Sequence, residues 1–422
     1  MRPTSGFPAI VSALISADPG PGGPGALPAE RATPPQELGH YLQEIRVKKS
    51  IYATALAATA ALALAACGAA PEDEEPAAGG DETTASESTD DATEGADNSD
   101  FLACVVSDQG GWDDQSFNQS AFEGLQAAVS ELGIEQADAE SQADSDYGPN
   151  VDSMVQQGCN LTIGVGFLLE DPIQAAAEAN PDTNFALIDS TFSDADFNPV
   201  ELENAKPIIF NTAEAAYLAG YVAAAMTETG TVATFGGLQI PSVSIFMDGF
   251  ADGVAKHNED NGTDVQLLGW DKEAQNGSFT GDFENQANGQ TLTEQFIAQG
   301  ADIVMPVAGP VGLGAAAAAQ AAGDVKIIGV DSDWYESTEY GAIALTSVVK
   351  QIGQAVQDTI TESVEGNFTN EPYIGTLENE GVGLAPFHDF DAEVPQEVKD
   401  AVTALQEQIV SGELVVESPN AP

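Results

Sequence analysis

Short apolar runs alternate with stretches of helical periodicity from residue 101 to residue 365, and this alternation limits the fold more than any other feature of the sequence. The first apolar run covers residues 101–107, and the first helical stretch covers residues 117–132. Strands at this spacing with helices between them form βαβ units, which assemble into parallel sheets. The scheme runs through twice, so the sequence predicts an α/β fold of two Rossmann-like lobes with parallel sheets joined by a hinge.

The remaining elements follow the same alternation up to residue 365, and a closing helix follows at 395–411. The expected strands are 161–165, 185–189, 207–210, 231–235, 264–270, 302–306, 325–331 and 342–347, and the expected helices are 171–179, 213–226, 243–257, 285–299, 311–322, 351–365 and 395–411. We place the first crossing between the lobes at residues 227–231, so that lobe 1 covers 101–228 and lobe 2 covers 229–366. Two further strand candidates, 370–375 and 382–386, suggest that the C-terminal segment 367–422 returns in part to lobe 1.

A membrane-targeting signal precedes these lobes. Three basic residues, Arg46, Lys48 and Lys49, are followed by an apolar run of 16 residues, 51–66, and then by Cys67. A basic start, an apolar run of this length and small residues before the cut are typical of a secretory signal peptide, here 47–66, and the run is shorter than the roughly 20 residues of a spanning helix. The sequence from Leu64 to Cys67 resembles a bacterial lipobox, so we expect cleavage before Cys67 and lipid attachment to its thiol. The alternative is an ordinary signal peptide with a chance cysteine.

The segments on either side of the signal peptide differ in character. Residues 1–46 are rich in Pro and Gly and carry no amphipathic period, so we hypothesise that Val47 is the true initiator and that 1–46 is a mis-annotated extension. Detection of peptides from residues 1–46 by mass spectrometry would contradict this. Residues 71–100 hold twelve acidic and no basic residues, so we expect 67–100 to form a disordered, self-repelling tether after the lipid anchor.

The two remaining cysteines are Cys104 and Cys159, both at or near predicted strands. In an exported protein an even pair of cysteines forms a disulfide by default. We therefore expect a bond between them, and the alternative is two buried free thiols.

The net charge of −57 excludes a nucleic-acid ligand, because binding phosphates needs a basic face that this chain cannot assemble. Residues 101–422 hold 52 acidic residues against six lysines and no arginine, a net charge of −46. Such an acidic shell is compatible with a high-salt exterior or an actinobacterial source.

The densest polar constellation, residues 107–124, follows the first strand and opens the first helix. In open parallel sheets ligands bind beyond the carboxyl ends of the strands. Two glycines, Gly110 and Gly111, let the backbone turn there and let a ligand approach closely. Four acidic residues and no basic one disfavour an anion, so a neutral, hydroxyl-rich or amide-bearing ligand is the better fit. The alternative is an acidic turn in which Asp113 or Ser116 caps the helix.

The sequence offers little for an enzyme. The three histidines, His40, His257 and His388, show no metal-binding spacing, and Ser116 has no neighbouring His or Lys to activate it. Asp113 and Asp114 are adjacent and cannot act together as acid and nucleophile. We expect no catalytic residue, no metal and no cofactor.

The order of motifs along the chain resembles the basic membrane protein family, which comprises lipoprotein substrate-binding subunits of ABC importers such as the purine nucleoside receptors. The opening motif is Asp108, Gly110, Asp113, Asp114, Ser116, Phe117, Asn118 and Gln119, followed by 122–124. Seven further matches follow in order, at 164–167, 185–190, 236–249, 281–289, 307–314, 328–333 and 346–350. The resemblance implies a type I periplasmic-binding-protein fold.

The resemblance also implies roles for individual residues. Phe117 and Phe283 resemble the two aromatics that stack on the purine, one from each lobe. Asp108 and Asp189 resemble acceptors for base N–H groups, while Asp331 and Lys350 resemble the partners of the ribose hydroxyls. Four residues complete the expected ligand site: Gln109, Trp112, Asn118 and Phe167.

Together these features predict a lipid-anchored, extracytoplasmic binding protein that closes on a nucleoside and presents it to ABC permease and ATPase subunits. Two alternatives stay open. The ligand could be a sugar or another polyhydroxylated solute, since the same polar side chains would serve hydroxyl groups. The protein could also be a surface receptor or adhesin with no role in transport.

Overall fold

The computed structural model describes residues 98–422, with the exception of residue 197. The predicted extension 1–46, the signal peptide 47–66, Cys67 and the tether as far as residue 97 lie outside the described residues. Within residues 98–422, no helix combines the length and the apolar character that crossing a membrane requires.

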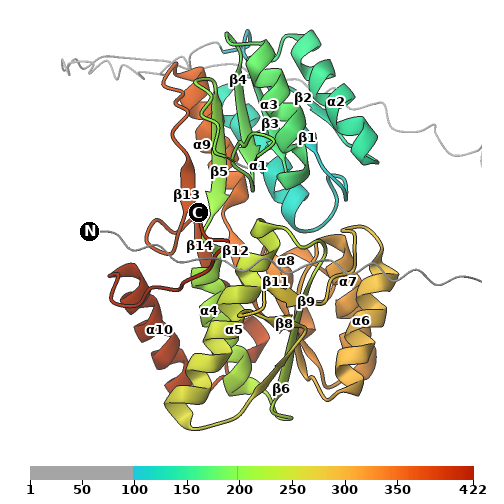
Figure 1. Ribbon diagram of the computed structural model, residues 1–422, viewed down its shortest axis with the longest axis vertical. Coiled ribbons are helices and arrows are strands. Elements are labelled where there is room, and N and C mark those ends of the chain that lie inside the picture. The colour runs from blue at the N-terminus through green and yellow to red at the C-terminus, as the bar shows by residue number, and fades with distance from the viewer. Residues whose placement is uncertain (1–97, 197) are drawn as a thin grey trace, which may run out of the picture. The chain divides into compact units, whose positions relative to one another are not determined.

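The first sheet has six parallel strands in the order β13-β5-β4-β3-β1-β2 (Figure 1). Its strands are β1 (Leu102–Ser107), β2 (Glu135–Ala139), β3 (Leu161–Val165), β4 (Asn184–Ile188), β5 (Ala205–Phe210) and β13 (Tyr373–Gly375).

The second sheet repeats this arrangement, in the order β14-β12-β11-β10-β6-β7, and only β14 runs antiparallel. Its strands are β6 (Thr231–Gly236), β7 (Gln266–Leu268), β10 (Ile303–Val307), β11 (Lys326–Asp331), β12 (Ala344–Lys350) and β14 (Val382–Leu384), and a hairpin of β8 (Trp270–Asp271) and β9 (Asn276–Gly277) lies beside it. The predicted α/β fold with two parallel-dominated sheets is confirmed.

Helices cover both faces of each sheet. In the first lobe α1 (Phe117–Leu132) and α9 (Ile352–Val364) pack on one face, and α2 (Asp144–Gln157) and α3 (Glu170–Ala179) on the other. In the second lobe α4 (Thr212–Met226) and α5 (Pro241–Asn261) pack together on one face, and α6 (Gln286–Ala298) and α7 (Pro310–Ala322) on the other. The short α8 (Trp334–Ser337) follows β11, and α10 (Gln396–Val410) packs against α4.

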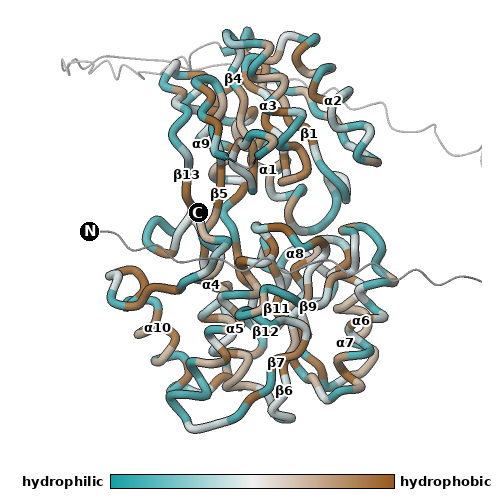
Figure 2. Tube along the Cα trace, in the orientation of Figure 1, coloured by the Kyte–Doolittle hydropathy of each residue, from teal (hydrophilic) through white to brown (hydrophobic). Residues whose placement is uncertain are grey.

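The central strands are buried along their whole length. All five residues of β3 and all five of β10 are buried. Because helices cover both faces, these strands read as continuous apolar runs and not as alternating ones. Figure 2 shows this apolar colour along the strands, with hydrophilic colour on the connecting loops.

The chain first crosses between the lobes one helix earlier than the predicted 227–231. Helix α4, which we assigned to lobe 1, packs against α5, β12 and β14 of the second lobe. Twelve of its fifteen residues are buried, so it needs neighbours on every side. Its backbone approaches α5 so closely that a Cβ on Gly253 would lie 2.0 Å from the carbonyl oxygen of Tyr217. The crossing is therefore at Asn211, between β5 and α4.

The return crossing is also one helix earlier than expected. We assigned α9 to lobe 2, yet it packs against α1 of the first lobe. A Cβ on Gly124 of α1 would lie 2.3 Å from the carbonyl oxygen of Gly353, so only glycine allows this approach. Of the two late strands, β13 joins the first sheet and β14 the second. Helices α4 and α9 each pack in the lobe opposite to the strand that precedes them. Three connections therefore cross between the lobes, from β5 to α4, from β12 to α9 and from β13 to β14.

Two elements of the first lobe were not predicted at all, β2 and α2. The strand β2 lies at the edge of its sheet and has the polar sequence EQADA, because an edge strand needs no apolar side chains on both faces. Helix α2 buries only Tyr147, Val151 and Met154, and it contains Pro149. Neither segment therefore carries the apolar signal on which the prediction depends.

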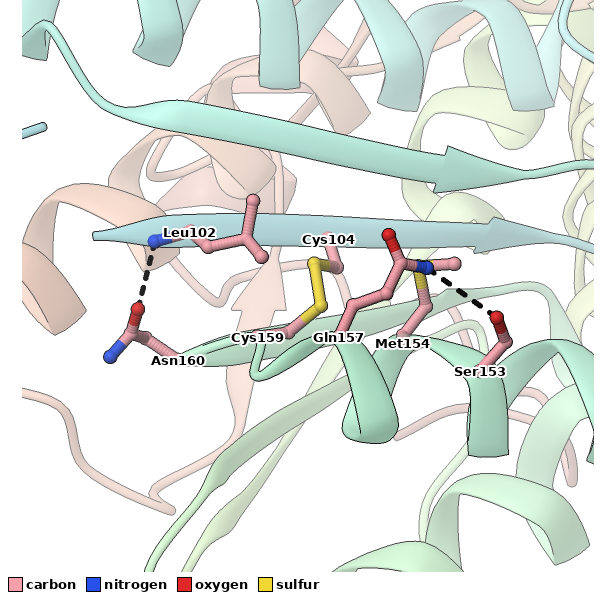
Figure 3. The surroundings of a disulfide bond; sticks show 7 residues. All are labelled: Leu102, Cys104, Ser153, Met154, Gln157, Cys159 and Asn160. Carbon is pink, nitrogen blue, oxygen red and sulfur yellow. Dashed lines mark hydrogen bonds between the residues drawn. A yellow bond between two sulfur atoms is a disulfide. The ribbon is translucent and has the colours of Figure 1, made fainter. Parts of the chain in front are cut away.

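The predicted disulfide between Cys104 and Cys159 is confirmed (Figure 3). It joins β1 to the turn before β3, with a Cα–Cα distance of 6.0 Å, and both residues are buried. Beside it the backbone N–H of Leu102 donates to Oδ1 of Asn160 at 2.8 Å. The bond fixes the end of α2 against the centre of the first sheet.

Removing the disulfide should destabilise the protein without changing its fold. The bond spans a sequence separation of 55 residues, and closing a loop of this size stabilises a native state by about 2–4 kcal/mol. We expect the variant C104A/C159A to lose about that much free energy of unfolding in urea titrations. Dithiothreitol should lower the stability of the wild type and leave the variant unchanged. Equal responses of both proteins to the reductant would contradict the prediction.

Candidate functional site

A cleft between the lobes is lined from the carboxyl ends of both sheets. The first lobe contributes Asp108, Gln109, Asp114, Phe117, Asn118, Gly166, Phe167 and Asp189, and the rest of the lining is Ile240, Ser242, Val243, Phe246, Phe283, Val307, Ala308, Gly309, Pro310, Asp331 and Lys350. Nine of the ten predicted ligand residues are therefore brought together. In this structure the cavity between them has a volume of about 60 Å³.

Asp108 follows β1 and is only 8% exposed. Its carboxylate lies against Gly166, where a Cβ would come within 2.0 Å of Oδ2 and where φ is +116°, so both space and backbone conformation require glycine. Burial raises the pKa of Asp108 well above its usual value, and Asn118 opposes this by hydrogen bonding. The group is a hydrogen-bonding side chain with little access to water.

Two amide side chains lie beside Asp108 with acceptor atoms to spare. Nδ2 of Asn118 donates to the carbonyl oxygen of Gln109 at 2.9 Å, and Nε2 of Gln109 donates to Oδ1 of Asp144 at 3.2 Å. Among the residues that the structure describes, neither Oδ1 of Asn118 nor Oε1 of Gln109 has a partner, although both atoms are buried. Unsatisfied buried acceptors are costly, so this end of the cleft is suited to a ligand that donates N–H or O–H groups.

Asp114 fixes the start of α1, whereas the alternative interpretation of this loop named Asp113 or Ser116 as the cap. Its carboxylate accepts hydrogen bonds from the backbone N–H groups of Ser116, Asn118 and Gln119 at 2.8–3.0 Å. These donors have no partner within the helix, and satisfying them stabilises its first turn. Phe117 is the first residue of α1, so Asp114 also sets the position of its ring.

Lys350 forms the charged centre of the cleft. Its Nζ lies 2.6 Å from Oδ2 of Asp189 and 3.6 Å from Oδ1 of Asp331, and only 2% of its side chain is exposed. The same Nζ lies 4.6 Å from the ring centre of Phe117, within range of a cation–π interaction. Burial raises the pKa of both aspartates, and the lysine counteracts this shift. The resemblance implies that Asp189 accepts hydrogen bonds from base N–H groups. In the structure its carboxylate instead pairs with Lys350, the residue to which the resemblance gives a role at the sugar.

Asp189 and Asp331 occupy equivalent places in the two sheets. Asp189 follows β4 and Asp331 ends β11, and these strands hold the same position in the two strand orders. Both residues have left-handed backbone conformations, with φ of 67° and 68°. A non-glycine residue pays about 1 kcal/mol or more for such a conformation and keeps it where the surroundings enforce it, often at binding sites.

Direct hydrogen bonds connect the lobes across the cleft. The hydroxyl group of Ser116 donates to Oδ2 of Asp331 and to the carbonyl oxygen of Val330, and Oγ lies 3.1 Å from each of them. Oγ of Ser332 donates to the carbonyl oxygen of Gln115 at 3.1 Å. The loop before α1 and the loop after β11 are therefore in contact, as expected of a closed arrangement of the lobes.

Phe117 and Phe283 bring aromatic rings to the cleft from different parts of the chain. Phe283 lies between β9 and α6, and its ring packs on Gly237, where a Cβ would lie 2.3 Å from the ring.

Trp112 does not line the cleft, contrary to our prediction. Its ring stacks on Phe122 at 5.1 Å between centroids, and its Nε1 donates to Oδ2 of Asp138. Trp112 therefore stabilises the loop before α1 and does not face the cleft.

The sequence reasoning missed most of the wall that the second lobe provides. Ile240 directly precedes α5, and Ser242, Val243 and Phe246 lie in its first two turns. Residues 307–310 run from the end of β10 to the start of α7. Both segments come directly after strands of the second sheet. The rule that ligands bind beyond the carboxyl ends of parallel strands could have identified them.

Two α/β lobes, three crossings and a polar cleft between the carboxyl ends of both sheets define a solute-binding protein. The chain belongs to the Bmp family of PnrA-like ABC transporter substrate-binding proteins, whose family model matches residues 101–419. The resemblance in the motifs is thereby confirmed. Members of this family are substrate-binding proteins of transporters and not enzymes.

Individual relatives agree with this assignment. The chain is 32% identical over 345 residues to "ABC transporter nucleoside-binding protein BmpA" of Lactococcus lactis subsp. cremoris, which covers 77% of this chain and 92% of that protein. It is 30% identical over 350 residues to "CD4+ T-cell-stimulating antigen" of Listeria innocua, covering 78% and 92%. Its structure is similar to an ABC transporter solute-binding protein from Aeropyrum pernix K1, with a TM-score of 0.65, 26% identity and coverage of 75% and 92%.

Replacing Lys350 with methionine should destabilise the protein by about 3–5 kcal/mol at pH 7.5, because Asp189 and Asp331 would be buried without a counter-ion. The loss should shrink as the pH falls through the raised pKa values of these carboxyls, since their protonated forms need no cation. Urea titrations from pH 7.5 to pH 5 would measure both effects.

The matched control is Lys256→Met, which removes a lysine that pairs with Asp260 at 2.6 Å on the surface of α5. An exposed pair of this kind contributes about 1 kcal/mol or less. If Lys350→Met costs no more than this control, Lys350 does not have the role described here.

Proposed function

We propose that the protein captures a nucleoside, with a purine base, in the cleft between its lobes and delivers it to the permease and ATPase subunits of an ABC importer. The observation that carries the proposal is the presence of Phe117 and Phe283, from different lobes, in the lining of one cleft. Stacking on an aromatic side chain contributes about 1–3 kcal/mol per base, whatever the base. Two such rings favour a planar ligand over a sugar.

The polar groups of the cleft match the two ends of a nucleoside. Asp108 and the free acceptor atoms of Gln109 and Asn118 suit the N–H groups of a base. At the other end, Asp331 and Lys350 can accept from and donate to ribose hydroxyls. The Lactococcus relative is named as a nucleoside-binding protein, which supports the same proposal.

The charges of the cleft favour uncharged nucleosides over nucleotides. Four aspartates and one lysine line it, and the lysine already pairs with Asp189. A phosphate group would meet carboxylates in a region of low dielectric, where like charges repel strongly. We therefore expect binding to be lost when a phosphate is added to the ligand.

Ligand entry requires the lobes to separate. The cavity volume of about 60 Å³ is below the roughly 300–1,000 Å³ of typical ligand pockets. A ligand that contacts both lobes favours the closed state by its differential affinity for that state. Hinge closure at the three crossings is therefore the mechanism that we propose, with no covalent chemistry.

We also propose that lipid attached to Cys67 anchors the protein on the outer side of the cell membrane. The apolar run 51–66 and the small residues before Cys67 support this. The acidic segment 67–100 would then be a tether that keeps the lobes 101–422 within reach of the permease.

A thermal-shift screen with adenosine, guanosine, inosine, cytidine and free pentoses tests the ligand class. We expect at least one purine nucleoside to raise the melting temperature of the wild type. The double variant F117A/F283A should bind that nucleoside about 30-fold or more weakly, because two stacking contacts are lost. Isothermal titration calorimetry would measure the change.

Phe390→Ala serves as the matched control, since this phenylalanine lies outside the cleft. It should leave nucleoside affinity unchanged. A pentose that raises the melting temperature while all four nucleosides leave it unchanged would show that the nucleoside assignment is wrong and would favour the sugar alternative.

Replacing Cys67 should release the protein from the membrane. In a bacterial host that lipidates exported proteins, we expect the wild type to partition into the detergent phase of a Triton X-114 extract. Cys67→Ala should appear in the aqueous phase or the medium. Cys159→Ala, a cysteine change within the lobes, should partition like the wild type, and equal partitioning of Cys67→Ala would count against the anchor.

A further inference from the structure

A second cavity opens directly beside the cleft and shares four of its lining residues, Phe167, Asp189, Ser242 and Lys350. Its volume is about 1300 Å³, far larger than that of the cleft. Because Asp189 and Lys350 form the shared boundary, the cavity adjoins the end of the cleft that the proposed function assigns to the sugar. A substituent on that sugar would extend into it.

The lining of the second cavity is acidic and rich in hydroxyl groups. Glu170 and Asp171, at the start of α3, and Asp194 face it together with Ser190, Thr191 and Ser193. Oγ of Ser190 and Oγ of Ser193 donate to the two carboxylate oxygens of Glu170 at 2.7 and 2.6 Å, which holds that side chain in place. Among the described residues that line this cavity, Lys350 is the one cation, and Asp189 neutralises it.

An unpartnered hydroxyl group points independently to a ligand. Thr212, the first residue of α4, lines the cavity and is only 1% exposed. Within the part of the chain that the structure describes, its Oγ1 has no hydrogen-bond partner. A buried hydroxyl without a partner is costly, and a ligand group in the cavity would satisfy it.

The far wall of the cavity is a fixed part of the structure. Residues 419–422 line it, and Asp248, which is fully buried in α5, holds them in place. The carboxylate of Asp248 accepts hydrogen bonds from Oγ of Ser418 at 2.6 Å and from Nδ2 of Asn420 at 3.0 Å. Trp270 and Gln275 donate to its other oxygen. Side chains of both lobes therefore line the cavity.

We infer that this cavity is a subsite for a cationic, hydrogen-bond-donating extension on the sugar of the bound nucleoside. Three carboxylates without a cationic partner attract an ammonium group, and the hydroxyls of Thr212 and its neighbours accept its remaining N–H bonds. The inference rests on the proposed function, because the cleft has to hold the nucleoside from which the extension projects. The protein would then accept amino-substituted nucleosides and reject phosphorylated ones.

Calorimetry with matched ligands tests the inference at low ionic strength. The probes are adenosine, guanosine and inosine, their 5′-amino-5′-deoxy derivatives, which are cationic at neutral pH, and their 5′-phosphates. We expect the amino derivative to bind about threefold to tenfold more tightly than its parent, as partly exposed carboxylates permit. Because salt screens exposed charges, 0.5 M NaCl should reduce this advantage. The 5′-phosphate should bind more weakly than the parent nucleoside.

The double variant E170Q/D171N should abolish the advantage and leave the affinity for the parent nucleoside unchanged. The matched control is Glu178→Gln, an exposed carboxylate on the same helix α3 that does not line the cavity. It should keep the full advantage. Thr212→Val should also weaken binding of the amino derivative, without lowering the melting temperature of the free protein, since the hydroxyl has no partner to lose.

The outcomes separate the two proposals. If no nucleoside binds, the proposed function fails and the subsite fails with it. If a parent nucleoside binds but its amino derivative has equal or lower affinity, the subsite is wrong while the proposed function stands. An advantage that E170Q/D171N retains would place the recognition of the amine elsewhere and would also overturn the subsite.

Discussion

The ammonium group of Lys350 joins parts of the chain that are far apart in sequence, and the geometry of the cleft depends on it. It pairs with Asp189 at the end of one sheet and Asp331 at the end of the other, and it faces the ring of Phe117. Burying a lone lysine or a lone carboxylate costs several kcal/mol, so each of these groups is tolerable only because the others are present. Lys350 also ends β12, one residue before the chain crosses into α9. The ion cluster therefore lies at one of the three crossings between the lobes.

The likeness between the lobes explains how two carboxylates converge on one cation. The sheets have corresponding strand orders, and the loops after β4 and β11 place Asp189 and Asp331 in the same left-handed conformation. When the carboxyl ends of two such sheets face each other, the two aspartates meet at the boundary between the lobes. The helix exchange maintains this arrangement, since α4 and α9 each pack in the lobe opposite to the strand that precedes them.

Predictions from the sequence succeeded where burial imposes a pattern. Buried strands such as β3 and β10 and the apolar helix α4 gave clear signals, and nine of the ten ligand residues predicted from the ordered motifs line the cleft. The edge strand β2 and the half-exposed α2 escaped because they need few apolar residues. Sequence also could not assign α4 and α9 to their lobes. That choice depends on close backbone contacts at Gly253 and Gly124, and a glycine in a sequence does not reveal which chain segment approaches it. The prediction that Trp112 lines the cleft was wrong for a related reason, because the sequence does not show that its ring stacks on Phe122.

Several polar groups that line the cleft are poorly satisfied by the described residues, and this gives a physical reason for the proposed closure on a ligand. The carboxyl of Asp108 has a raised pKa through burial, and the acceptor atoms of Gln109 and Asn118 lack partners within the described chain. In an open state water can reach these groups, whereas closure without a ligand removes that water and supplies nothing in return. A ligand with N–H donors satisfies them only when the lobes are closed, so its binding energy acts selectively on that state. If the proposed function holds, the acidic character of residues 101–422 favours neutral or cationic groups over phosphates, because a phosphate raises the electrostatic free energy of the closed cleft.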